Sequence, residues 1–165
     1  MITLVYLSLL MAVTGVFAAC VYGHSVPRSV SAMVYSYPRK LAWLWSAWLI
    51  AVGGLLLPVM MERLEDRLCV FGFLTFAFTV GAAVTPLVNR ETSEWHDWFG
   101  VASGLMSQAV VTILAADWLF AWLLFPAFLP FTYMRSRLVL VSELCCAVSL
   151  YGCLLSDSVG DFLLL

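Results

Sequence analysis

Hydrophobic residues along this chain form long runs, and short polar segments separate them. The runs cover residues 2–22, 41–61, 69–88, 98–134 and 138–155. A helix needs about 20 mostly apolar residues to cross a bilayer. Each run is about that long or longer, so the pattern predicts an all-α protein that crosses a membrane several times.

The run 98–134 is too long for one crossing. At about 1.5 Å per residue it would extend about 55 Å as a single helix, well beyond the bilayer core. Its single charged residue is Asp117. We therefore divide it into helices 98–116 and 118–134, the second kinked by Pro126 and Pro130. The chain is then a polytopic membrane bundle of six transmembrane helices forming one domain, residues 1–165.

The connection from residue 23 to residue 40 has a helical pattern of its own. Ser25 can cap a helix start, Pro27 suits a first turn, and Pro38 would end it. Apolar residues recur on one face of this segment: Val26, Val30, Met33, Val34 and Tyr37. This pattern predicts a short helix lying in the membrane interface. The alternative is an irregular re-entrant turn.

Basic residues are distributed unevenly between the two sides of the predicted bundle. Only Arg63 and Arg67 lie on the side of the termini. The other side holds Arg28, Arg39, Lys40, Arg90, Arg135 and Arg137. Cytoplasmic loops are enriched in Lys and Arg. The expected location is a bacterial inner (cytoplasmic) membrane, with both termini outside the cytoplasm.

Composition agrees with a membrane protein and excludes several other classes. The chain is 64% hydrophobic and 11% charged, whereas a soluble domain has about 25% charged residues. Its formal net charge is −2, and no basic stretch suits a nucleic acid. The expected partners are the lipid bilayer and, beyond it, other membrane proteins or a second copy of the chain.

The five cysteines form no CxxC pair and no recognisable metal site, so neither a metal nor another cofactor is expected. Phe17-Ala18-Ala19-Cys20 loosely resembles a lipoprotein cleavage box. The first basic residue is Arg28, however, so the basic start of a signal peptide is missing. We therefore expect residues 2–22 to remain as a helix.

Small residues mark the faces on which the helices should pack. The fourth helix has the clearest stripe, with members four residues apart: His96, Gly100, Gly104, Gln108 and Thr112. Small residues let helix backbones approach closely in membranes. Similar stripes lie on the first helix (Ser8, Ala12, Gly15, Ala19), the third (Gly72, Thr75, Thr79, Ala83) and the sixth (Ser142, Cys145, Ser149, Gly152). Together the four stripes predict a compact bundle with the fourth helix near its centre.

Glu143 is the most unusual polar residue, because it lies inside the sixth predicted helix. An ionisable group within a membrane indicates function by default. The alternative is a carboxylate near the interface that pairs with Arg135 or Arg137. If it instead faces His24 or His96 across a cavity, a proton-linked or metal-linked site follows.

The other candidates are His24, Ser31, His96, Asp97 and Gln108. A His near Ser and Asp could hydrolyse a bond, and a His–carboxylate set could bind a metal. The simpler interpretation is that Asp97 compensates the helix dipole and that His96 lies at an interface. Gln108 is more typical of a hydrogen bond between helices.

Residues 26–35 carry a Pro-basic-Ser-aliphatic-Ser motif, Val26-Pro27-Arg28-Ser29-Val30-Ser31 and the residues after it. The motif is similar to one in small uncharacterised bacterial and phage-type membrane proteins. The Trp-rich second helix and the His96…Gly100 helix resemble that group as well. The resemblance implies a six-helix membrane fold and no established activity.

These patterns favour a non-catalytic accessory or interaction protein. The second hypothesis is a transporter or channel subunit for a small solute or ion, based on Glu143, Gln108 and the proline-containing fifth helix. The third is a membrane-embedded hydrolase. Seven-helix membrane hydrolases with a three-histidine zinc site were considered, but this chain has only His24 and His96.

Overall fold

The structure is a computed structural model that describes residues 1–23, 29–88, 94–128 and 137–163. Within these ranges the chain is helical and contains no strand. The elements are α1 (Ile2–Gly23), η1 (Ser31–Ser36), α2 (Ala42–Arg63), α3 (Cys69–Val88), α4 (Glu94–Ala115), η2 (Ala116–Leu123), α5 (Leu124–Phe128) and α7 (Leu138–Leu163), where η denotes a 3₁₀ helix. The all-α prediction is confirmed.

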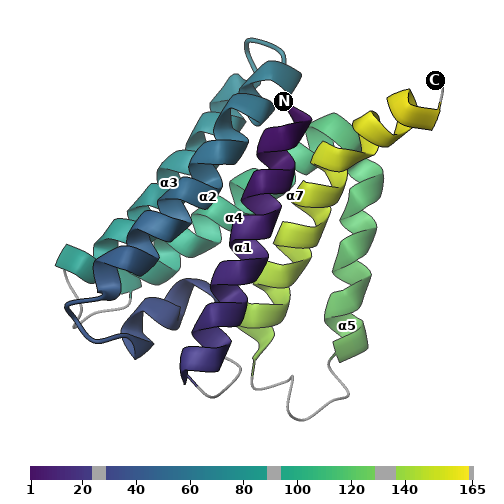
Figure 1. Ribbon diagram of the computed structural model, residues 1–165. Helices are drawn as coiled ribbons and strands as arrows, with labels where there is room; N and C mark the ends of the chain where they lie inside the picture. Colours follow the sequence, from purple (N-terminus) through teal and green to yellow (C-terminus); the bar gives the residue numbers. More distant parts are fainter. Residues whose placement is uncertain (24–28, 89–93, 129–136, 164–165) are drawn as a thin grey trace.

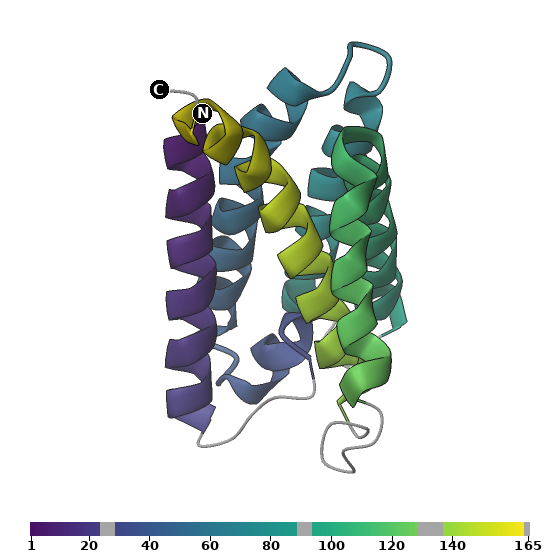
Figure 2. The ribbon, with the colours of Figure 1, turned by 90° about the vertical axis from the view of Figure 1, so that its right-hand side faces the viewer.

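Five helical stretches of the described chain are long and apolar enough to cross a membrane. Four of them lie within α1, α2, α3 and α7, and the fifth, Glu94–Phe128, combines α4, η2 and α5. The long elements run up and down, and the N-terminus and the end of α7 lie at the same end of the bundle (Figures 1 and 2). The predicted bounds of the second and third helices agree with α2 and α3 to within two residues.

The chain reverses at Ala115, one residue before the predicted division. Ala115 has φ −160° and ψ 81°, an extended conformation that ends α4. Trp122 Nε1 donates a 2.9 Å hydrogen bond to Gln108 Oε1. In a continuous helix these residues would be about 21 Å apart along the axis, so η2 must fold back onto α4.

The type of helix that follows this reversal differs from the prediction. Residues 116–123 form a 3₁₀ helix rather than an α-helix, and α5 then continues to Phe128. Pro126 is the third residue of α5, within the first turn, where proline is tolerated. Pro130 lies outside the described residues.

A short 3₁₀ helix occupies part of the segment for which an interfacial helix was predicted, and its place in an interface stays a prediction. Residues 31–36 form a single 3₁₀ segment, shorter than the predicted helix, and no side chain caps its start. Met33 and Val34 are buried, as the apolar face predicted. Ser25 and Pro27, the expected start, lie outside the described residues.

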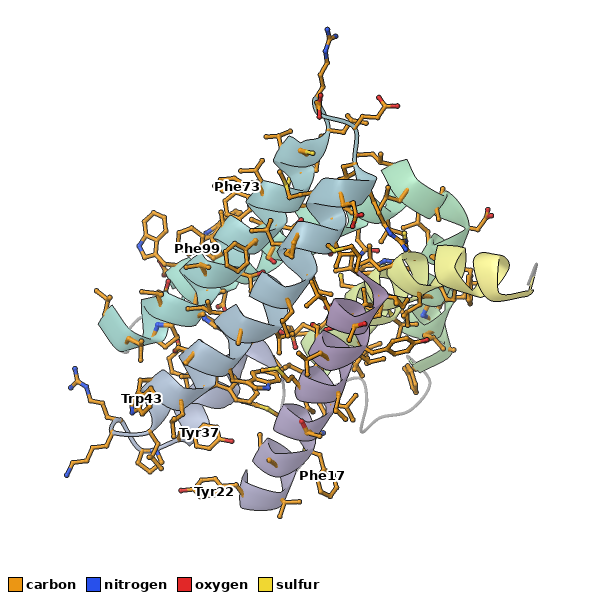
Figure 3. The ribbon with its side chains drawn as sticks, turned by 45° about the horizontal axis from the view of Figure 1, so that its top comes forward. Phe17, Tyr22, Tyr37, Trp43, Phe73 and Phe99 are labelled. Carbon is orange, nitrogen blue, oxygen red and sulfur yellow. The ribbon has the colours of Figure 1, made fainter. Side chains whose placement is uncertain are left out.

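The main core lies between α1, α2, α4 and α7. Its buried side chains include Val5, Val59, Met60, Val110 and Leu154. The exterior is apolar as well: Phe17, Trp43 and Phe73 project outwards (Figure 3), and Phe17 is 70% exposed. A soluble monomer rarely exposes large contiguous apolar patches, whereas lipid is a favourable solvent for such a surface.

Glycines let aromatic rings lie directly against helix backbones at three places. A Cβ at Gly15 would lie 2.2 Å from Trp48, one at Gly152 would lie 2.2 Å from Trp118, and one at Gly81 would lie 2.8 Å from Phe99. Such distances are far below van der Waals contact. These glycines, on α1, α7 and α3, therefore set how closely neighbouring elements pack.

The small-residue stripe on α4 is only partly a packing face. His96 and Ser107 are buried, but a Cβ at Gly100 would meet no atom within 4 Å, and Thr112 is exposed. A Cβ at Gly104 would be in ordinary contact with Cys146 Sγ at 3.6 Å. The stripe therefore packs closely at His96 and Ser107 but not at Gly100 or Thr112.

Candidate functional site

The side chain of Glu143 crosses from α7 to the segment that precedes η1. Its Oε1 accepts hydrogen bonds from Ser29 Oγ (3.0 Å), Ser31 N (3.1 Å) and Ser31 Oγ (2.6 Å). Its Oε2 accepts one from Val30 N at 2.5 Å. Glu143 thus ties the connection between the first two long helices to the last one.

All these contacts come from donors, which matches an ionised carboxylate, a group that can only accept hydrogen bonds. The two serine hydroxyls also lie 2.9 Å apart. Because each hydroxyl has one proton, the hydroxyls can both point at the carboxylate only if neither donates to the other. Consecutive backbone N–H groups that converge on an anion form a nest, which offsets the desolvation of the charge.

The predicted alternative, a pair of Glu143 with Arg135 or Arg137, stays a prediction. The described contacts of Glu143 are with residues 29–31, and Arg135 lies outside the described residues. Charge-assisted hydrogen bonds are about twice as strong as neutral ones. The segment 29–31 therefore supplies polar partners that a carboxylate inside a helix bundle requires.

His96 lies near the start of α4 and is 1% exposed. Its Nδ1 is 2.8 Å from the carbonyl oxygen of Ala82 on α3. A carbonyl can only accept, so Nδ1 carries a proton and, in the neutral ring, Nε2 is an acceptor. Nε2 has no hydrogen-bond partner among the described residues, and the ring of Tyr35 meets the imidazole edge-on at 5.5 Å.

Of the other members of the predicted polar cluster, Ser31 bonds Glu143, whereas Asp97 has no described bond to Glu143 or His96. Asp97 is exposed in the first turn of α4, as expected for dipole compensation, whereas the preceding His96 is buried. His24 lies outside the described residues. Within the described chain no cluster of three or more His, Cys, Asp or Glu could hold a metal.

The η1 segment connects Glu143 and His96 only indirectly. Ser31, at its start, bonds Glu143, whereas Tyr35, four residues later, contacts His96. Four residues of 3₁₀ helix span about 8 Å. The two predicted site residues therefore form separate contacts with one short helix, one from α7 and one from α4.

Gln108 forms a second polar network inside the bundle. Its Oε1 accepts from Trp122 Nε1 (2.9 Å) and Ser149 Oγ (2.8 Å), and its Nε2 donates to Ser107 Oγ (3.1 Å) and Cys146 O (3.5 Å). These contacts use the full hydrogen-bonding capacity of the amide. Gln108 thus joins α4, η2 and α7, in agreement with the interhelical role expected for it.

Ser8, which was expected on the packing stripe of the first helix, makes a third polar contact. Its Oγ donates to the Val52 carbonyl at 2.9 Å and lies 2.7 Å from the Tyr151 hydroxyl. Since the Ser8 proton is used on Val52, Tyr151 must be the donor of the second bond. This buried contact joins α1, α2 and α7.

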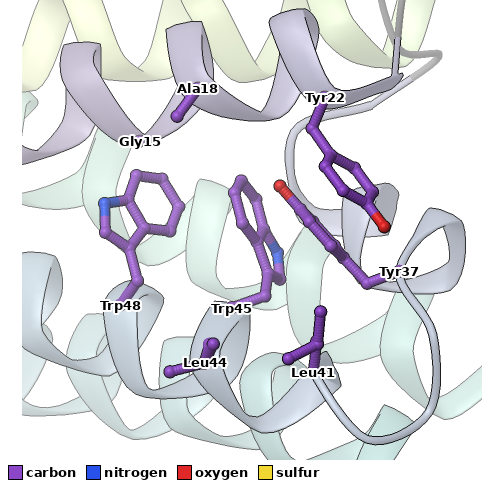
Figure 4. A pocket seen from close by; sticks show the side chains of 8 residues that line it. All are labelled: Gly15, Ala18, Tyr22, Tyr37, Leu41, Leu44, Trp45 and Trp48. Atoms are coloured by element: carbon purple, nitrogen blue, oxygen red, sulfur yellow. The ribbon is translucent and has the colours of Figure 1, made fainter.

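An aromatic pocket of about 280 Å³ lies between α1 and α2 (Figure 4). Four rings form a ladder along it, with successive centroid distances of 5.2, 6.0 and 4.3 Å: Tyr22, Tyr37, Trp45 and Trp48. Burial, then the neighbouring Tyr22 and Cys20, raise the pKa of the Tyr37 phenol above its usual value. The phenol is therefore neutral at physiological pH, and the wall is uncharged.

Sequence reasoning identified Glu143 and Gln108 but missed most of their partners. Ser29 was expected on the same side as Glu143, yet the backbone N–H of Val30 is invisible to any residue-type motif. Ser149 was expected on a packing stripe of the sixth helix, but no sequence signal indicated that it and Trp122 bond Gln108. Their roles depend on the reversal at Ala115 and on contacts between distant parts of the chain.

Comparison with protein-family models, with curated proteins and with solved structures found no match to this chain.

Proposed function

We propose that this chain is a multi-pass integral membrane protein with a non-catalytic accessory or interaction role. The proposal rests on one observation: the polar side chains of Glu143 and Gln108 are bonded to other parts of the fold. Glu143 is bound by donors from residues 29–31, and Gln108 has every hydrogen-bonding position filled. Groups bound so completely stabilise a fold and leave little capacity for a substrate.

The proposed topology has six crossings in a bacterial inner membrane, with both termini outside the cytoplasm. Residues 118–134 would make the fifth crossing, which the reversal at Ala115 supports. The turn with Arg39 and Lys40 and the start of α7 after Arg137 lie at the end opposite Arg63 and Arg67 (Figure 1). The enrichment of basic residues favours the cytoplasm for the first of these ends.

The apolar exterior provides the surfaces on which a membrane partner would bind. Large side chains are exposed on two separate helices, Phe17 and Leu10 on α1, and Trp98 and Leu105 on α4. An accessory protein should use one such face for its partner and leave the others to lipid. The partner is another membrane protein or a second copy of this chain.

A photo-crosslinker scan in the native membrane tests this proposal. The reactive amino acid would replace Leu10, Phe17, Trp98 or Leu105 in turn, with buried Val5 as a matched control. We expect a discrete crosslinked protein from positions on one helix face only. Crosslinks to lipid alone at all four exposed positions would contradict the interaction role.

Transport of a small solute or ion is the second candidate, and one observation favours it. The 3₁₀ segment η2 interrupts regular α-helix beside the Gln108 network, and transporters often place sites at interrupted helices. A hydrolase has less support. His96 bonds the Ala82 carbonyl and Ser31 bonds Glu143, so a His–Ser pair would need a rearrangement of both contacts.

A further inference from the structure

The aromatic pocket between α1 and α2 has a charged rim directly beside it. Tyr37 and Leu41 both line the pocket, and the chain between them is Pro38-Arg39-Lys40. Arg39 and Lys40 are exposed. Two cations are therefore held at one end of an apolar groove by the turn that forms its wall.

The groove itself suits a hydrocarbon chain. Its other walls are Gly15 and Ala18 of α1 and Leu44, Trp45 and Trp48 of α2 (Figure 4). The only side-chain oxygens among these residues are the hydroxyls of Tyr22 and Tyr37. A volume of about 280 Å³ is at the small end for ligand pockets, so it fits part of a lipid rather than a whole one.

Packing fixes the position of Trp48, which lines the groove. Trp48 lies against Gly15, where a Cβ would be only 2.2 Å from the indole. Its Nε1 donates to the Met11 carbonyl at 2.8 Å, which fixes the orientation of the ring. The ring therefore forms a rigid wall that a flexible aliphatic side chain would not provide.

We propose that this groove binds one acyl chain of an anionic phospholipid, with the phosphate at Arg39 and Lys40. The inference rests on the membrane location proposed above. The occupant follows from charge complementarity, because a bilayer supplies acyl chains and anionic headgroups joined in one molecule. Each Lys or Arg near an anionic surface is worth about 1 kcal/mol, or about fivefold in affinity.

Quenching of tryptophan fluorescence by lipids with brominated acyl chains tests the site. The full-length protein is measured in detergent with brominated phosphatidylglycerol or brominated phosphatidylcholine at equal mole fractions. We expect stronger quenching by phosphatidylglycerol. The excess should vanish in the double variant Trp45→Phe/Trp48→Phe, whose remaining tryptophans lie outside the pocket.

Two variants test the contributions of the cations and of the groove separately. Arg39→Gln/Lys40→Gln should lower the apparent affinity for phosphatidylglycerol at least fivefold, whereas Arg67→Gln, an exposed cation at the opposite end, should not. Ala18→Leu, which narrows the groove, should weaken quenching while both cations remain. Glycerol phosphate without acyl chains should not compete.

Results that refute the lipid site differ from results that refute the membrane location of the protein. Equal quenching by the two lipids, or an excess that survives Arg39→Gln/Lys40→Gln, would refute the anionic lipid site but leave a protein in contact with lipid. Competition by glycerol phosphate would mean that a headgroup alone is bound, which also refutes it. Absence of quenching by either lipid would refute both the site and the membrane location.

Discussion

Replacing Glu143 by glutamine should substantially destabilise the bundle, although the two side chains have nearly the same shape. The carboxylate takes three donors on Oε1 and one, the N–H of Val30, on Oε2. The amide oxygen of glutamine can occupy only one of these positions. If it takes the Oε1 position, the NH₂ group faces the N–H of Val30, donor against donor.

The expected magnitude follows from these contacts. Loss of one hydrogen bond to a charged group costs about 1.5–3 kcal/mol, and the remaining bonds weaken when their acceptor becomes neutral. We therefore expect Glu143→Gln to lower the free energy of unfolding by about 2–4 kcal/mol. For a chain of this size that corresponds to a fall in Tm of roughly 5–15 °C.

Thermal unfolding in detergent, followed by a maleimide dye that fluoresces on reacting with thiols, measures this change. Cys145 and Cys153 are buried and react only when the bundle opens. Ser142→Ala is the matched control, because its hydroxyl bonds only the Val139 carbonyl of its own helix. That variant should change the unfolding temperature by no more than about 2–4 °C.

A double-mutant cycle with Ser31→Ala shows whether Glu143 acts through residues 29–31. Ser31 provides two of the donors to Oε1, one of which the alanine variant removes. The two substitutions should be less than additive by at least about 0.5 kcal/mol. Two results would refute the conclusion that Glu143 holds α7 to the segment 29–31. One is an unfolding temperature of Glu143→Gln equal to that of the wild type, and the other is strict additivity in the cycle.

The remaining predictions concern packing, the second polar network and topology. Gly152→Ala should lower Tm by several degrees, because its Cβ would lie 2.2 Å from Trp118, whereas Gly100→Ala should leave it unchanged or raise it slightly; the same thiol assay compares them. Gly104→Leu should reduce the folded yield in detergent more than Leu105→Phe, since Leu105 is 62% exposed; equal yields would mean that Gly104 faces lipid. Gln108→Leu should cost about 1–3 kcal/mol in unfolding free energy by leaving Trp122 Nε1 without its acceptor, whereas Ser149 keeps the Cys146 carbonyl. A C-terminal reporter that is active only in the cytoplasm should be silent, and a strong signal would overturn the proposed orientation.

Hydrophobic run length was enough to predict the long helices. The bounds of α2 and α3 agree with the predicted segments because the bilayer thickness and the flanking charged residues determine where an apolar helix stops. The reversal near Asp117 was predictable for the same reason, since one helix of that length cannot fit. The 3₁₀ form of η2 was not, because it depends on packing of these residues against α4 and α7.

The partners of the polar residues could be predicted only in part. Glu143 stands out in any apolar run, but its contact with Val30 joins residues 113 positions apart through a backbone N–H. The burial of His96 against Ala82 likewise depends on how α3 meets α4. Small-residue spacing placed Gly15 and Gly152 on packing faces, but not the rings that pack against them. Those contacts require the actual positions of Trp48 and Trp118.

Flux through proteoliposomes containing the purified full-length chain tests the central claim most directly. Proton flux is followed with a trapped pH dye, and ion flux with a potential-sensitive dye, under an imposed gradient. If the bonded polar groups serve the fold alone, flux should equal that of empty liposomes. Flux well above that level, lost in Gln108→Leu while the variant remains folded, would contradict the accessory role and support transport.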